Sequence, residues 1–175
     1  MSPPQKFAHV VYRTDDPARL RDWYLTVLEA RVAFENSFIC FLTYDEEHHR
    51  VAIVADPKFT RPARPRAVDH VAFTYSDLRS LVDTHSRLRE HSIEPYWTVN
   101  HGPTTSFYYR DPDGNGVELQ VDNYETVDEL HEFFRSAHFA DNPIGIDVDV
   151  DELRARLDAG EPVASLLLRA DLATS

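Results

Sequence analysis

The sequence predicts an α+β fold in which two βαβββ modules form a curved mixed sheet, followed by a helical C-terminal extension. Two segments, KFAHVVYRTDDPARLRDWYLTVL and AVDHVAFTYSDLRSLVDTHSRLRE, both have the pattern of a strand, a turn and a helix, and both contain a His-Val pair in the strand. Three further strand-like stretches follow each of them. From residue 123 onward, the composition changes to Asp, Glu and helix formers.

The first module begins with a strand in which Phe7, His9 and Val11 share one face. A helix is expected next, because Asp16 is a favourable N-cap and Pro17 suits the first helical position. Its apolar residues form one stripe and are Leu20, Trp23, Tyr24, Val27 and Leu28. The second helix repeats this stripe after Ser76 with Leu78, Leu81, Val82, His85 and Leu88.

The remaining strands complete the two modules. They are expected at 32–34, 38–44 and 50–55 in the first module, and at 93–99, 105–109 and 116–121 in the second. We therefore expect one domain over residues 1–122, with module one at about 6–56 and module two at about 66–122, and a helical extension over 123–175. The proline-rich stretch between the modules is interpreted as a solvated linker.

Composition excludes several classes of partner. The 18 basic and 30 acidic residues give a net charge of −12, which repels phosphate backbones and anionic lipid headgroups. No apolar run approaches the length of a membrane span, and the N-terminus lacks the apolar core of a secretory signal. The single cysteine, Cys40, lies in an apolar stretch and is expected to be a buried thiol. These features predict a cytoplasmic protein without nucleic-acid or membrane partners.

The stretch SFYYRDPDGNGVELQV predicts an antiparallel hairpin, because DPDGNG is rich in turn-forming residues. Tyr108 and Glu118 are equally distant from its centre near Asp113 and are expected to face each other. Alternation then places Val117, Leu119 and Val121 toward the helices. It leaves Glu118 on the open face, and it places Phe107 and Tyr109 in the core, away from Tyr108.

His9 and His70 open the two modules at matching positions, so the curved sheet is expected to bring both imidazoles to the cavity that contains Glu118. Two imidazoles and one carboxylate form the ligand set that leaves open positions on a ferrous ion. Each residue taken alone is more often a hydrogen-bonded strand histidine or a solvent-facing glutamate. Their matched positions in a duplication nevertheless predict a metal cavity.

Residues 99–118 resemble the signature of the type I extradiol ring-cleaving dioxygenases, the family of catechol and dihydroxybiphenyl dioxygenases within the vicinal oxygen chelate superfamily. The matching residues are Val99, His101, Phe107, Tyr108, Asp111, Pro112, Gly114 and Glu118. A shorter match, HHRVAIV, resembles the family segment in which the second histidine of a pair is the catalytic acid/base, which would be His49. The alternative is that these two histidines are ordinary loop residues.

The resemblance implies that His9, His70 and Glu118 hold Fe(II), with Mn(II) as an alternative metal, while a catechol and O₂ take the open positions. It also implies that Tyr108 and His101 hydrogen-bond the bound diol and the reacting oxygen. His49 would move the proton, and Asp111 would serve the turn and a hydrogen bond next to the ligands. The longer members have four modules, so this chain resembles a short, single-domain form. A homodimer is expected from the superfamily.

Two other functions remain open at this stage. Glyoxalase-type and fosfomycin-resistance-type enzymes share the fold, but glyoxalase sites add a carboxylate from the last strand of module one, and RVAIVA has none. A metal-free drug-binding module of the bleomycin-resistance type would leave the three predicted ligands without a shared role. In the extension, Phe133, Phe134 and Phe139 are candidates for a pocket lid or for ordinary packing.

Overall fold

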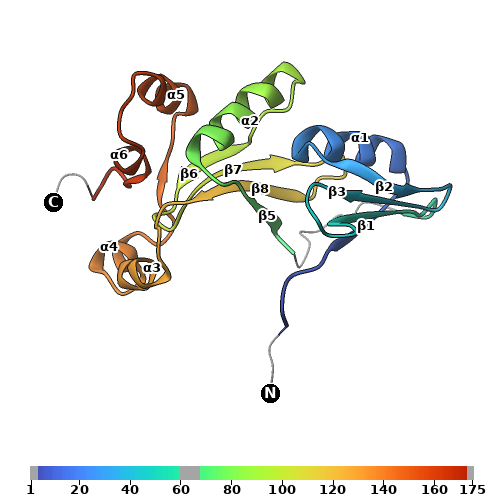
Figure 1. Cartoon of the computed structure of the whole chain (residues 1–175), viewed down its shortest axis with the longest axis horizontal. Coiled ribbons are helices and arrows are strands. Elements are labelled where there is room, and N and C mark those ends of the chain that lie inside the picture. The colour runs from blue at the N-terminus through green and yellow to red at the C-terminus, as the bar shows by residue number, and fades with distance from the viewer. Residues whose placement is uncertain (1–3, 60–67, 173–175) are drawn as a thin grey trace. The chain divides into compact units, whose positions relative to one another are not determined.

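The computed structural model describes residues 4–59 and 68–172, so most of the expected linker lies outside the described residues. The chain divides into two compact units (Figure 1). The first comprises residues 1–69 with the short segment 111–115, and the second comprises residues 70–110 and 116–175. Each is described by itself.

The first unit contains a four-stranded mixed sheet and one helix. Its elements are β1 (Val10–Thr14), α1 (Pro17–Leu28), β2 (Arg31–Glu35), β3 (Ile39–Thr43) and β4 (Val51–Ala55). The sheet order is β1-β4-β3-β2, with β1 parallel to β4 and the other pairs antiparallel. Asp16 caps α1 by accepting a hydrogen bond from the Arg19 backbone N–H, as predicted. Leu20, Tyr24 and Val27 are fully buried, so the predicted stripe of α1 forms the core.

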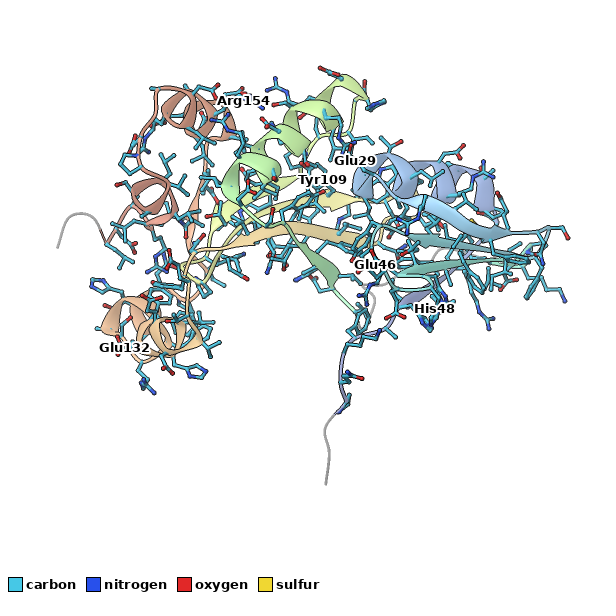
Figure 2. The ribbon with its side chains drawn as sticks, viewed as in Figure 1. Glu29, Glu46, His48, Tyr109, Glu132 and Arg154 are labelled. Carbon is cyan, nitrogen blue, oxygen red and sulfur yellow. The ribbon has the colours of Figure 1, made fainter. Side chains whose placement is uncertain are left out.

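The second unit repeats this arrangement with β5 (His70–Thr74), α2 (Leu78–Glu90), β6 (Trp97–Asn100), β7 (Thr104–Arg110) and β8 (Gly116–Asp122). Its sheet has the order β5-β8-β7-β6-β9, where β9 is the short strand Ile146–Asp147, and β5 is parallel to β8. Val117, Leu119, Phe107 and Tyr109 are buried, and Tyr109 lies between the sheet and α2 (Figure 2). The predicted α+β class and the two mixed βαβββ modules are therefore confirmed.

The extension is helical, as the composition predicts, and contains α3 (Val127–Phe134), α4 (Ala137–Asp141), α5 (Val150–Asp158) and α6 (Val163–Leu167). The sequence analysis missed the short strand β9 (Ile146–Asp147), which pairs with β6. A strand of two residues is too short to show the alternation of apolar and polar residues by which strands are recognised. The division into a domain over 1–122 and an extension over 123–175 stays a prediction.

Two smaller expectations are also resolved. Cys40 is buried, and burial raises the pKa of its thiol to about 11. No helix within residues 4–59 and 68–172 combines the length and the apolar character needed to cross a bilayer.

Candidate metal centre and active site

Four predicted site residues lie together in the second unit. Tyr108 on β7 pairs directly with Glu118 on β8, which confirms the register predicted from the hairpin. His70 begins the neighbouring strand β5, and its Nε2 lies 2.9 Å from Glu118 Oε2. Glu118 is only 4% exposed. An imidazole nitrogen and a buried carboxylate therefore meet at one point of the sheet, and both groups are common ligands of divalent metals.

Tyr108 and His101 form a hydrogen-bonded pair beside these donors. His101 Nε2 lies 2.9 Å from the Tyr108 hydroxyl, and the Trp97 indole stacks on the Tyr108 ring with 5.0 Å between centroids. Burial raises the pKa of Tyr108 well above its ordinary value, and the negative charge of Glu118 raises it further. The Tyr108 side chain is consequently a neutral phenol at physiological pH.

The histidines of the first unit form a second cluster. The His9 and His49 ring centroids are 4.3 Å apart, and the His49 ring stacks on Phe41 at the same separation with an interplanar angle of 8°. His48 Nδ1 lies 2.6 Å from His49 Nδ1, and the His48 side chain lies on the side of the sheet opposite α1 (Figure 2). The first unit therefore places the predicted ligand His9 in ring contact with the predicted acid/base His49.

The environment of His49 favours its neutral form. Burial lowers the pKa of this imidazole, and positive charge on His9 or His48 lowers it further. A neutral imidazole retains one nitrogen lone pair that accepts a proton. His49 is thus in the protonation state that a base requires near neutral pH.

Asp111 organises the turn of the hairpin within the first unit. Its carboxylate accepts hydrogen bonds from the backbone N–H groups of Asp113 and Asn115, at 2.9 and 2.7 Å. It also accepts from the Asn115 amide at 2.5 Å and from the Tyr24 hydroxyl at 3.2 Å. The predicted turn role is confirmed, whereas a role beside metal ligands stays a prediction.

The donor chemistry of the predicted ligands fits a metal. Within either unit, the described residues contain no group of three or more His, Cys, Asp or Glu side chains that could hold an ion. The second unit brings together one imidazole and one carboxylate, those of His70 and Glu118, whereas the third predicted ligand, His9, belongs to the first unit and its ligation of the same ion stays a prediction. Nitrogen and oxygen donors of these types suit Fe(II), Mn(II) or Zn(II).

Comparison with known proteins decides the family. Residues 6–119 match the Glyoxalase/Bleomycin resistance protein/Dioxygenase superfamily, a span that covers nearly all of both modules. The chain belongs to this superfamily. It is also 44% identical over 165 residues to biphenyl-2,3-diol 1,2-dioxygenase 2 of Rhodococcus globerulus, covering 93% of this chain and 87% of the relative. Biphenyl-2,3-diol 1,2-dioxygenase 3 of the same organism is 42% identical, with coverage of 97% and 91%. The resemblance to the extradiol dioxygenases is confirmed.

Solved structures show the same fold at lower identity. A lactoylglutathione lyase from Agrobacterium tumefaciens is 18% identical, with a TM-score of 0.56, over 69% of this chain and 96% of that one. The fosfomycin resistance protein FosX of Listeria monocytogenes, solved with Mn(II) and sulfate, is 16% identical with a TM-score of 0.58, over 76% of this chain and 100% of that one. At these identities the likeness concerns the fold alone.

The sequence analysis missed the surroundings of His101. His101 Nδ1 hydrogen-bonds the backbone carbonyl of Ile144, and the buried Arg169 side chain bonds the carbonyls of His138 and Asn142 in the same region. A contact with a backbone carbonyl cannot be predicted from the sequence pattern, because every residue carries the same carbonyl group. One signal was available, because Arg169 directly follows the apolar run Leu166–Leu168, where a charged residue needs buried partners.

Proposed function

We propose that the protein is an extradiol dioxygenase that uses a divalent metal to insert both atoms of O₂ into a catecholic ring and cleave it next to the diol. The observation that carries this proposal is the 44% and 42% identity to two biphenyl-2,3-diol 1,2-dioxygenases over nearly the whole chain. The pairing of Glu118 with His70, and of Tyr108 with His101, supports it from the structure.

The proposed metal ligands are His9, His70 and Glu118, and the proposed ion is Fe(II), with Mn(II) as the alternative. When bound, Fe(II) would supply a shared contact for the diol and O₂, through which electron density passes between them. Three protein ligands leave positions for both reactants. The 2.9 Å approach of His70 Nε2 to Glu118 Oε2 supports this set, since both donors already face one point.

The remaining site residues bind the diol and handle its protons. Tyr108, held neutral by burial and by the charge of Glu118, hydrogen-bonds the diol, and His101 supports it through its contact with the Tyr108 hydroxyl. The stack of the half-buried Trp97 on the buried Tyr108 provides an aromatic surface for the ring of the substrate. His49, a neutral imidazole in contact with His9, accepts the proton that the diol loses and returns it during ring cleavage.

The substrate proposed for the first test is biphenyl-2,3-diol, because both curated relatives are named for it. An isomerase or transferase of the glyoxalase type is disfavoured because β4, VAIVA, offers no carboxylate as an additional ligand. A metal-free binding module is disfavoured because Glu118 would then be a buried carboxylate without a catalytic role. We also propose a cytoplasmic homodimer with a catalytic domain over residues 1–122 and a helical extension over 123–175.

The test is anaerobic loading of the full chain with Fe(II), followed by air and a panel of catechols that includes biphenyl-2,3-diol. We expect stoichiometric oxygen uptake and a yellow ring-fission product. Loading with Mn(II) in parallel identifies the metal, and light scattering on a sizing column determines the oligomeric state. Bound metal without oxygen uptake would favour the isomerase, and failure to bind metal would favour the binding module.

A further inference from the structure

His101 is held at both ring nitrogens. Nδ1 contacts the backbone carbonyl of Ile144, and Nε2 lies 2.9 Å from the Tyr108 hydroxyl. A carbonyl oxygen only accepts hydrogen bonds, so Nδ1 must carry the proton. In the neutral ring, Nε2 is then an acceptor, and it shares the single phenol proton of Tyr108 with the Glu118 carboxylate, which also hydrogen-bonds this hydroxyl. When Nε2 accepts this proton, the Tyr108 oxygen presents its lone pairs to a hydroxyl of the diol.

The Ile144 carbonyl is positioned by a tight turn. The Asn142 side-chain oxygen accepts hydrogen bonds from the backbone N–H groups of Ile144 and Gly145, and its amide donates to the Gly145 carbonyl. Gly145 has a φ of +112°, and a Cβ there would lie 2.3 Å from the Asn100 carbonyl oxygen. Only glycine lets this turn lie directly against the strand end that leads into His101.

Arg169 secures this turn from the C-terminal end of the chain. Its side chain is fully buried, and its guanidinium donates to the carbonyls of Asn142 at 2.7 Å and His138 at 3.0 Å. Asp171 pairs with the same guanidinium through both of its carboxylate oxygens. A buried cation with fixed carbonyl partners is a rigid support for the backbone at 138–145.

We propose that Arg169 is a positioning residue that, through the Asn142–Gly145 turn and the Ile144 carbonyl, fixes His101 in the Nδ1–H tautomer and so keeps Nε2 as an acceptor for the Tyr108 hydroxyl. The predicted effect on catalysis rests on the proposed function. The tautomer of His101 can be measured whether or not the protein is active. It gives the C-terminal extension a specific role in the active site, since Ile144 and Arg169 both lie beyond residue 122. Partners that orient a functional histidine in this way typically change activity by about 10- to 100-fold when removed.

The tautomer is tested by nitrogen-15 NMR of histidine side chains in the full chain without added metal, with His101 assigned from the spectrum of the His101→Ala variant. We expect the Nδ1–H form in the wild type and a mixture of tautomers in Arg169→Ala and Gly145→Ala. Arg156→Ala is the matched control, because Arg156 also forms a two-pronged ion pair, with Glu161, but on the surface. An Nε2–H tautomer in the wild type would overturn the proposal, as would a tautomer that is unchanged in both variants.

The catalytic consequence is tested by a double-mutant cycle on kcat with the diol that the enzyme turns over. Arg169→Ala is expected to lower kcat by about 10- to 100-fold in the wild-type background and by less than about twofold in the His101→Ala background. Equal losses of kcat in the two backgrounds would show that Arg169 does not act through His101 and would refute the positioning role. Gly145→Ala, which leaves the Arg169–Asp171 ion pair intact, replaces Arg169→Ala if that variant does not fold. If no diol is turned over, the proposed function fails while the tautomer experiment still decides this inference.

Discussion

Replacing Asp111 by alanine tests how the hairpin that carries Tyr108 and Glu118 is held. Asp111 is 3% exposed and accepts four hydrogen bonds. Two of the donors, the Asp113 N–H and the Tyr24 hydroxyl, belong to residues that are themselves at most 3% exposed. Each buried donor left unpaired costs about 1–3 kcal/mol, so we expect a loss of about 2–5 kcal/mol in the free energy of unfolding.

The assay is urea unfolding monitored by circular dichroism, with thermal melting as a second measurement. For a chain of this size, about 3 kcal/mol corresponds to a decrease in Tm of roughly 6–12 °C. Asp113→Asn is the matched control, because it changes a neighbouring carboxylate in the same turn while retaining an oxygen acceptor for Arg19. A loss below about 1 kcal/mol for Asp111→Ala would mean that water replaces these bonds and that the turn does not depend on the carboxylate.

Asp111 also predicts a pH dependence of defined sign. Burial raises the pKa of this carboxyl above its ordinary value of 3.8, against the lowering effect of its hydrogen bonds. The folded state therefore binds the proton more tightly than the unfolded chain does. The contribution of Asp111 is most favourable below about pH 3.8 and is lost as pH rises through the folded-state pKa. Asp111→Asn should remove this decline, and parallel pH profiles of the two proteins would contradict the assignment.

Three further predictions concern the metal, the phenol and the core. Glu118→Ala should lose bound iron, whereas His49→Phe should retain iron and lose turnover, and equal iron loss measured by metal analysis would contradict this division of roles. Tyr108→Phe should keep bound metal and lower kcat by about 10²-fold or more, and unchanged steady-state kinetics would exclude Tyr108 from the reaction. Leu119→Ala, at a fully buried position of β8, should lower the free energy of unfolding in urea by about 2–5 kcal/mol. A decrease of less than about 1 kcal/mol would mean that neighbouring side chains move into the space left by Leu119.

Side-chain periodicity was sufficient to predict the two modules and the hairpin. Alternating apolar residues define which face of a strand is buried, and the DPDGNG turn centres the hairpin, so the sequence alone places Tyr108 opposite Glu118. The N-cap at Asp16 follows from the same local rules. His9, His70 and Glu118 were selected by chemistry and by matched positions in the duplication, and their joint ligation of one ion stays a prediction.

The sequence by itself determined the duplicated βαβββ pattern, the register of β7 and β8, and the residue types from which a metal site can be built. These depend on interactions between near neighbours in the chain, which leave periodic signals. Only the tertiary structure revealed that His9 lies against His49 and that Arg169 supports the turn whose carbonyl holds His101. Such contacts join distant residues, often through backbone carbonyls that are the same for every amino acid, so no pattern of side chains records them.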